Sequence, residues 1–217
     1  MFTSTTFDSI STPIESRIAT SFARIGTAMR SQAWELAVAN GLTPTQVDIL
    51  ALLAARSSPL RLSVIAEQLA ITPATASDAV STLVAKGLAE KGRDAEDGRA
   101  IALRLSASGA KLSATVAEAS GFLGLAVQSL GQEEKTQLLR MMIKVIRNLQ
   151  ESGKIPTSRM CVTCKYFDAN RYVGSTTPHH CNLVSAPMGV YHLRLDCPEH
   201  SEAEPLVANR NWLSFAG

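Results

Sequence analysis

The fold of this chain is decided by the stretch LSVIAEQLAITPATASDAVSTLVAKGLAEKGRDAEDGRAIALRLSASG, residues 62–109. Its first part predicts a short helix over 64–69, with Ser63 as the N-cap. Thr72-Pro73 predicts a turn and a second helix, because Thr is a favourable N-cap and Pro is favoured at the first helical position. The second helix is expected to end at Lys86-Gly87.

The spacing of the apolar residues then changes from a helical to an alternating pattern. Residues 88–91 and 101–105 are expected to form two strands, and the polar loop between them contains glycines. Two alternating segments joined by such a loop predict a β-hairpin with a long tip. The short run 60–62 can add one more strand. A helix, a tight turn, a second helix and a basic hairpin together predict a winged helix–turn–helix.

Small and hydroxyl side chains occupy the early turns of the second helix. Such a surface can enter the major groove of DNA, where hydroxyls exchange hydrogen bonds with bases and phosphates. Asp78 can accept a hydrogen bond from a cytosine amino group, or it can orient a neighbouring side chain. Cations around the hairpin, including Lys91 and Arg104, would meet phosphates, and an arginine at the tip can enter the minor groove. The residues expected to contact DNA are Thr72, Thr75, Ser77, Asp78, Ser81, Thr82, Lys86, Arg93 and Arg99. The alternative is a solvated helix and a charged hairpin of another purpose.

A long helix is predicted on each side of this region. From Ile10 to Met29 the apolar residues recur every three or four positions, and this helix is expected to stop near Asn40-Gly41. The second long helix covers 133–149, and its apolar face comprises Leu138, Leu139, Met142, Val145, Ile146 and Leu149. Each stripe needs a partner, either within its own subunit or in a second copy of the chain.

Residues 42–109 resemble the MarR family of bacterial transcriptional regulators. The matching segments are LTPTQ (42–46), LSVIA (62–66), LVAKGL (83–88), DAEDGR (94–99) and LRLSASG (103–109). The similarity covers residues 10–150. It implies that Asp97 braces the wing and that Arg99 is placed at DNA. Gly98 stands where many members have a second basic residue.

The resemblance also implies a homodimer built from the first and last helices. A two-fold dimer would read a pseudo-palindromic site on double-stranded DNA with two recognition helices. Family members commonly repress transcription and release DNA when a small molecule binds between the dimer arms and the DNA-binding lobes. We therefore expect a sequence-specific repressor with a small-molecule effector, which the sequence does not identify.

All four cysteines and all four histidines of the chain lie between residues 161 and 200. Cys161, Cys164, Cys181 and Cys197 have the spacing Cys-x2-Cys-x16-Cys-x15-Cys. A Cys-x2-Cys turn can point two thiolates at one metal, and the other two cysteines would complete the ligand set. His200 can replace one sulfur. The tail is too short to bury a core of its own, so a metal is expected to stabilise it.

Zinc is the expected metal, because four thiolates suit it and its binding energy would fold the segment. The alternative is an iron–sulfur cluster, since four cysteines also ligate such clusters. Residues 161–197 are similar to high-potential iron–sulfur proteins, but they lack the aromatic residue after the last cysteine. A thiol switch or two disulfides is a third reading. A zinc site would be structural, whereas a cluster would make the protein a redox or iron sensor.

Composition excludes several classes of protein. The net charge of +2 gives no global indication of nucleic-acid binding. The chain begins without a secretory signal, and its apolar runs are too short to span a bilayer, so we expect a cytoplasmic protein without a membrane partner. Thiols stay reduced in that compartment. The sequence lacks a Ser/His/Asp order, a glycine-rich phosphate loop and an acid–base pair near the cysteines, so we expect no enzyme.

The sequence thus predicts a mainly α-helical fold with a small β wing. A winged helix–turn–helix domain with long dimerisation helices is expected over 8–152, and a small metal-stabilised segment over 157–204. Two other functions stay open. One is a metalloprotein or redox carrier that does not bind DNA, and the other is a winged helix that binds protein.

Overall fold

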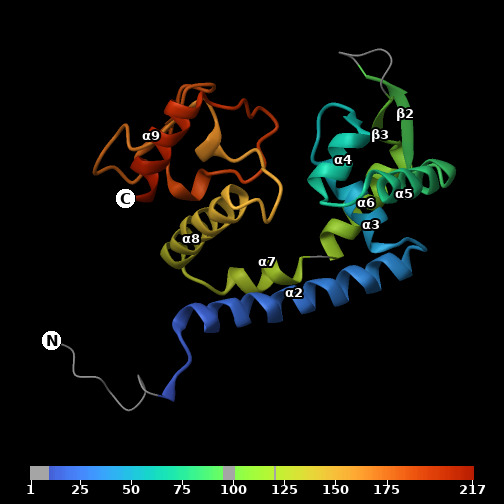
Figure 1. The fold of residues 1–217 in the computed structure, drawn as a ribbon, viewed down its shortest axis with the longest axis horizontal. Helices are drawn as coiled ribbons and strands as arrows, with labels where there is room; N and C mark the ends of the chain where they lie inside the picture. The colour runs from blue at the N-terminus through green and yellow to red at the C-terminus, as the bar shows by residue number, and fades with distance from the viewer. Residues whose placement is uncertain (1–9, 95–100, 120) are drawn as a thin grey trace. The chain divides into compact units, whose positions relative to one another are not determined.

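The computed structural model describes residues 10–94, 101–119 and 121–217 (Figure 1). The chain divides into two compact units, residues 1–47 and 48–217. The described part is mainly helical with two small three-stranded sheets. None of the described helices is by itself long and apolar enough to cross a membrane.

The first unit is dominated by α2, Ile14–Ala39. The apolar pattern predicts a helix from Ile10, but α2 begins after Pro13, because a proline is tolerated only at the start of a helix. The end of α2 agrees with the prediction. Gly41 adopts a φ of 62°, and the Leu42 N–H donates to the Ala37 carbonyl at 2.8 Å, which is a glycine-terminated C-cap.

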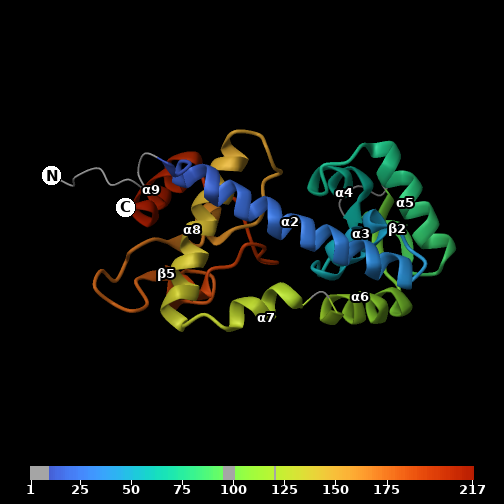
Figure 2. The same cartoon turned by 90° about the horizontal axis from the view of Figure 1, so that it is seen from below.

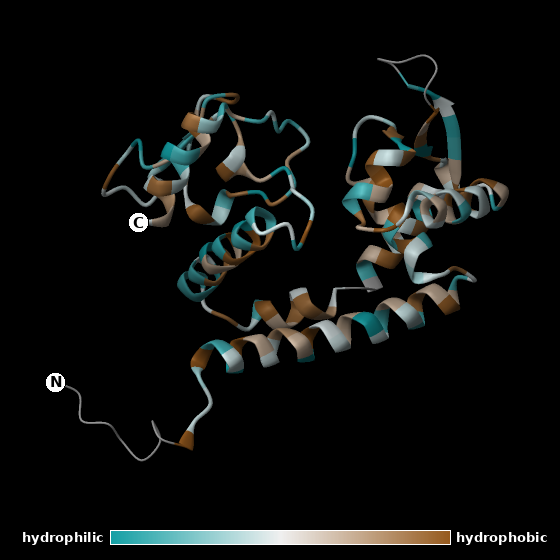
Figure 3. Cartoon of the chain, in the orientation of Figure 1, coloured by the Kyte–Doolittle hydropathy of each residue, from teal (hydrophilic) through white to brown (hydrophobic). Residues whose placement is uncertain are grey.

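The predicted apolar stripe of α2 is exposed in the single chain. Its members have exposed fractions between 40 and 58%, and they are Ile14, Ile18, Phe22, Ile25 and Met29. Figure 3 shows hydrophobic residues recurring along the length of this helix. A contiguous apolar stripe on a helix surface marks a face that another protein surface can cover.

The winged helix–turn–helix combines helices and a small antiparallel sheet. The helices are α3 (Pro44–Ala54), α4 (Leu62–Gln68), α5 (Pro73–Ala85) and α6 (Ala107–Ala119). The strands are β1 (Leu60–Arg61), β2 (Ala89–Arg93) and β3 (Ile101–Leu105), in the order β1-β3-β2. Figures 1 and 2 show α4 and α5 gathered beside these strands. The predicted hairpin is confirmed, with Lys91 opposite Leu103. The tip of the wing, 95–100, lies outside the described residues.

The turn between α4 and α5 has the predicted cap at its second helix. The Thr72 side chain accepts a hydrogen bond from the Thr75 N–H at 3.1 Å. The first helix differs from the prediction, because α4 begins at Leu62 and its N-cap is Arg61 rather than Ser63. Arg61 is the last residue paired to β3, so the chain passes directly from strand to helix. The turn itself contains Ala70 at a φ of 52°, a conformation that side chains other than glycine seldom adopt.

The core of this lobe is built from the inward faces of α3, α4, α5 and the sheet. Its buried members include Ile49, Leu50, Leu53, Ile65, Ala76, Val80, Leu83 and Leu103. The start of α6 is locked to the hairpin at a close approach of two backbones. The Gly109 N–H donates to Ser106 Oγ at 3.0 Å, and a Cβ on Gly109 would lie 1.9 Å from the Leu88 carbonyl oxygen. Only glycine fits there.

After α7 (Phe122–Gln128) and α8 (Gln132–Glu151), the chain forms a second core, which we call the cysteine module. Its elements are η1 (Cys161–Thr163), β4 (Phe167–Asp168), β5 (His179–Cys181), β6 (Ala186–Met188), η2 (Val190–His192) and α9 (Pro205–Ala216). The strands pair in the order β4-β5-β6. Its core comprises Ile143, Met160, Val162, Cys164, Phe167, Met188, Leu193 and Phe215.

The helix α8 presents its apolar residues to two different surroundings. Leu139, Ile143 and Ile146 pack into the core of the cysteine module. Met141 and Val145 stay exposed, as does Leu149. One side of the apolar face predicted for this helix is therefore covered within the same chain, which is one of the two alternatives left open by the sequence.

The helix α9, which the sequence did not predict, completes the cysteine module. The Arg140 guanidinium on α8 donates to the Phe215 carbonyl at 2.9 Å, and Lys144 Nζ donates to the Ala216 carbonyl at 2.5 Å. Cations at a helix C-terminus are favourable, because the carbonyls there carry partial negative charge. Arg147 lies over the Trp212 ring, 4.7 Å from its centre. The module thus includes α9 and one side of α8, beyond the predicted range 157–204.

Candidate nucleic-acid interface and cysteine site

The recognition-helix candidate α5 has one buried and one exposed face. Ala76, Ala79, Val80 and Leu83 are buried. Thr75, Asp78 and Ser81 are exposed, and their spacing of three residues places them on the outward face. Lys86, the C-cap, is exposed at the end of the helix. The structure therefore brings four of the predicted DNA-contacting residues to one accessible surface.

Three other residues of this helix that were predicted to contact DNA make contacts within the protein. Thr72 Oγ1 caps α5 and lies 2.8 Å from Thr75 Oγ1. Thr82 Oγ1 donates to the Asp78 carbonyl at 3.0 Å, inside the same helix. Ser77 is half-buried and lines a cavity of about 150 Å³ together with Lys91 and other residues of the hairpin. The Thr72 and Thr82 hydroxyls thus make contacts within the helix, and Ser77 lies where the helix meets the wing.

The hairpin carries two exposed cations on one face. Lys91 and Arg93 lie opposite Leu103 and Ile101 in the register of β2 and β3. They alternate along β2, so they share a face of the sheet. Lys91 lines the same cavity as Ser77, which places this face towards α5. A helix surface with cations beside it can bind nucleic acid through the groove and the phosphates together.

Arg104, which the sequence also placed among the cations near DNA, has an acidic partner in the hairpin. It lies opposite Glu90 in the hairpin, and the two side chains form an ion pair of 2.9 Å. The pair therefore belongs to the face of the hairpin opposite Lys91.

The base of the wing is held by a pair that sequence reasoning missed. Arg61 donates two hydrogen bonds to Asp94, from Nε at 2.9 Å and from Nη2 at 2.7 Å. The two residues are 33 positions apart, so no local pattern could have paired them. The predicted wing residues Asp97 and Arg99 lie outside the described residues.

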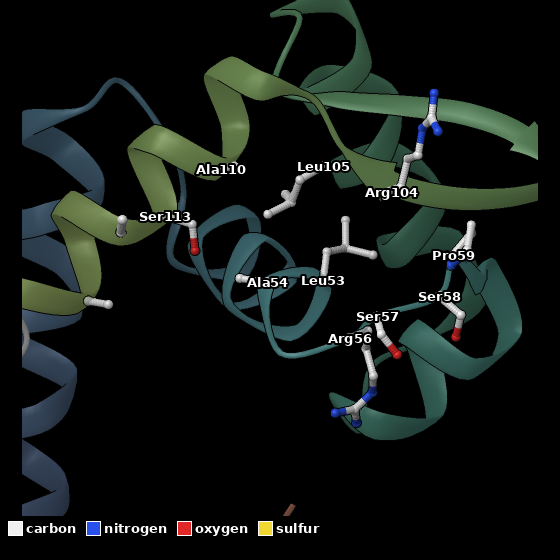
Figure 4. Close-up of a pocket in the computed structure, with 12 residues that line it drawn as sticks. Leu53, Ala54, Arg56, Ser57, Ser58, Pro59, Arg104, Leu105, Ala110 and Ser113 are labelled. Atoms are coloured by element: carbon white, nitrogen blue, oxygen red, sulfur yellow. The ribbon is translucent and has the colours of Figure 1, made fainter. Parts of the chain in front are cut away.

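An open cavity of about 560 Å³ lies between the end of α3, the following loop, β3 and α6. Its apolar wall includes Leu53, Leu105 and Ala110, and its polar groups include Ser113 and Arg104 (Figure 4). The volume falls within the range of pockets for small organic molecules. A mostly apolar wall with a guanidinium at its edge suits an apolar molecule that carries an acidic group.

The four cysteines, which come from distant parts of the cysteine module, meet at one cavity. All four are free thiols. They line a single cavity with an apolar lining, together with Tyr166, Phe167, Leu183, Met188 and Glu199. Burial, together with the neighbouring thiols Cys197, Cys164 and Cys181, raises the pKa of the Cys161 thiol, and the Arg194 N–H opposes this by donating to its sulfur at 3.3 Å.

Thiols in such surroundings become ligands only when a cation offsets the charge of their thiolates. As their side chains stand, no three His, Cys, Asp or Glu residues among those described meet the geometry of a site for one metal ion. The sulfurs instead surround the cavity.

The histidines hold the loops of the module. His179 Nδ1 accepts from the Asn170 N–H at 3.1 Å, and His192 Nδ1 accepts from the Gly189 N–H at 3.0 Å. His180 Nδ1 lies 3.1 Å from the Tyr172 hydroxyl. His200 Nε2 lies 3.0 Å from Thr163 Oγ1. The residues that line the cysteine cavity do not include these four histidines.

Comparison with known proteins finds matches for the winged helix–turn–helix. Residues 40–100 match the model of the MarR family. Staphylococcus aureus MepR in its DNA-binding conformation is 27% identical, with a TM-score of 0.55 over 61% of this chain and 98% of that chain. The S. aureus MepR–DNA complex is 26% identical, with a TM-score of 0.51 over 60% of this chain and 97% of that chain.

A MarR family regulator from Rhodococcus sp. RHA1 shares the fold, at 15% identity and a TM-score of 0.51 over 62% of this chain and 96% of that chain. No curated protein matches the chain. The chain therefore has a MarR-like winged-helix fold, and MarR family proteins are transcription regulators, not enzymes. The matched range 40–100 does not include the cysteine module.

Proposed function

We propose that this chain is a sequence-specific DNA-binding repressor that acts as a homodimer. The observation that carries the proposal is the outward face of α5, where Thr75, Asp78 and Ser81 are exposed. This face adjoins a hairpin whose Lys91 and Arg93 are exposed cations. A solved MepR structure similar to this chain is a complex with DNA. The helix would read base edges in the major groove while the cations bind phosphates.

The dimer would form through α2. The stripe from Ile14 to Met29 offers apolar area that the single chain leaves exposed. The exposed residues Met141, Val145 and Leu149 of α8 offer a second, smaller stripe. A two-fold dimer presents two copies of α5 and selects a pseudo-palindromic site.

The cavity in Figure 4 would bind the effector. It is lined by Leu105 at the end of the hairpin and by α6, so a bound molecule would contact the base of the wing. A ligand shifts DNA affinity only if it binds the two conformations differently. The four cysteines of the module would bind a metal, either as a structural site or as a sensor.

A mobility-shift titration with the DNA upstream of the chain's own gene tests the regulator. Asp78→Ala is expected to change the preference among base substitutions in the site, because its carboxylate would contact bases. Thr82→Val is the matched control, since the Thr82 hydroxyl is already bonded within α5, and it should bind like the wild type. The proposal would be contradicted if the protein retarded none of the upstream DNA fragments at protein concentrations below those at which it binds DNA nonspecifically.

A further inference from the structure

The cysteines of the module do not converge as the ligands of a single ion would, because no three His, Cys, Asp or Glu residues among those described have the geometry of a site for one metal ion. In a zinc tetrathiolate the sulfurs lie about 2.3 Å from the metal, which places them about 3.8 Å from one another. No water-sized body fits between sulfurs at that separation. The cavity lined by Cys161, Cys164, Cys181 and Cys197 has a volume of about 30 Å³. A volume of about 10–15 Å³ is already sufficient for one water molecule.

The four ligands reach this cavity from separate backbone segments. Cys161 is the first residue of η1, and Cys164 immediately follows η1. Cys181 ends β5, and Cys197 lies in the loop after η2. A backbone hydrogen bond from the Cys197 N–H to the Arg159 carbonyl, 2.9 Å long, holds that loop beside the start of the Cys-x2-Cys segment. The four thiols therefore line one cavity from three backbone segments.

The wall of the cavity is apolar rather than polar. Phe167 and Met188 are buried in the core of the module, and Tyr166 packs against it. The backbone N–H of Arg194 donates to Cys161 Sγ at 3.3 Å, and its Nη1 lies 3.9 Å from Cys197 Sγ. Hydrogen bonds to sulfur would stabilise thiolates around any metal. An apolar wall limits the access of water to a metal site, and the potential of an iron–sulfur cluster depends both on its exposure to solvent and on hydrogen bonds to its sulfurs.

We propose that the four cysteines ligate an iron–sulfur cluster in this cavity, in place of the single zinc ion expected from the sequence. The proposal rests on the metal site proposed above and identifies the group that this site takes. A cluster brings several iron and sulfide atoms, so its thiolate ligands need not converge on a single ion. Its binding energy would be released only when the three segments that carry the cysteines come together, which ties the fold of the module to the cluster.

The test begins with full-length protein from iron-supplied cells, purified without oxygen. We expect iron and acid-labile sulfide in equal amounts and a broad visible absorption. Cys181→Ser should abolish this absorption. His200→Gln is the matched control, because His200 is bonded to Thr163 and should leave the absorption unchanged. Loss of the absorption in His200→Gln with its retention in Cys181→Ser would overturn the assignment.

Misfolding of the serine variant is separated from ligand loss by a second experiment on the wild-type chain. Metal-free protein is offered sulfide with ferrous and ferric iron in equal amounts, or zinc, under anaerobic conditions. We expect formation of the cluster with iron and sulfide, and its persistence when zinc is added. Stoichiometric zinc with no iron or sulfide in both preparations would overturn the cluster. A mobility shift measured on the same samples tests the regulator separately, because α5 and the wing lie outside the module.

Discussion

Arg61 and Asp94 fasten the outer end of β2 to the edge strand β1 through two hydrogen bonds of 2.7 and 2.9 Å. The Asp94 side chain is only 13% exposed, so solvent screens the pair weakly. The contact lies where the hairpin leaves the body of the lobe. The orientation of the wing thus depends on a pair that itself lies outside the expected DNA contacts.

Asp94→Asn should weaken DNA binding through the position of the wing. If the substitution removes about 1 kcal/mol of interaction energy between Arg61 and Asp94 and DNA binding loses the same amount, Kd rises about fivefold. The slope of log affinity against log salt should stay constant, because no phosphate contact is removed. Glu90→Gln is the matched control, since it breaks the exposed pair with Arg104, and it should leave Kd within experimental error. Fluorescence anisotropy at several salt concentrations measures both quantities.

Arg93→Ala should affect the salt dependence itself. If this exposed guanidinium binds a phosphate, its removal lowers the slope of log affinity against log salt by about 0.9. Affinity for specific and nonspecific DNA should fall together, because phosphates carry no sequence information. The same anisotropy titration with Arg104→Ala offers a comparison, since Arg104 is paired with Glu90 and its loss should leave the slope unchanged. An unchanged slope in Arg93→Ala would show that Arg93 does not contact DNA.

Phe22→Asp should dissociate the proposed dimer. Phe22 lies in the middle of the exposed stripe of α2 and is 41% exposed in the single chain. A dimer would bury this carboxylate without a partner, which costs several kcal/mol. Ala23→Asp adds the same charge to a neighbouring exposed position outside the stripe and should leave the dimer intact. Sedimentation velocity at matched concentrations distinguishes the two, and a dimer that survives Phe22→Asp would exclude α2 as its interface.

Phe215→Ala should unfold the cysteine module without unfolding the winged helix. The Phe215 side chain is 1% exposed, and removing a buried phenyl ring costs about 3–5 kcal/mol. Leu213→Ala, two residues away at a position that is 64% exposed, should have little effect. Trp212, which lies 5.8 Å from the Phe215 ring, reports unfolding by fluorescence in a Trp34→Phe background. Equal loss of stability in both variants would contradict the packing of α9.

Acid should destabilise the module through His179. Burial, with a smaller contribution from Arg140, lowers the pKa of His179 from 6.5 to about 4. Between these values the unfolded chain binds a proton that the folded chain does not, so the free energy of unfolding falls as the pH is lowered through this window. This loss begins as the pH falls below 6.5 and is complete below about pH 4. His179→Phe should flatten this part of the pH profile of Trp212 unfolding, and an unchanged profile would refute the assignment.

Much of the winged helix could be predicted because its signals are local. Thr72-Pro73 marks the start of α5, and Gly41 marks the end of α2, because caps and prolines act within one turn of chain. The alternating run 101–105 gives β3 directly. The start of α2 differs from the prediction because Pro13 overrides the apolar pattern. The N-cap of α4 differs because Arg61 pairs with β3.

The roles of side chains were harder to predict than the elements that carry them. Arg104 looked like a phosphate ligand, but its partner Glu90 is decided by strand register. His200 looked like a possible substitute for one cysteine ligand, and the folded chain places its Nε2 3.0 Å from Thr163 Oγ1. Charge and residue type are properties of the sequence, whereas partners depend on which distant segments meet.

Residue order alone was sufficient for the helix–turn–helix and the hairpin, because capping and periodicity depend on near neighbours. Three features required the folded chain. These are the Arg61–Asp94 pair, the covering of one side of α8, and the gathering of the four cysteines around one cavity. Each depends on contacts between segments far apart in sequence, where the geometry is set by the packing of whole elements and not by local preference.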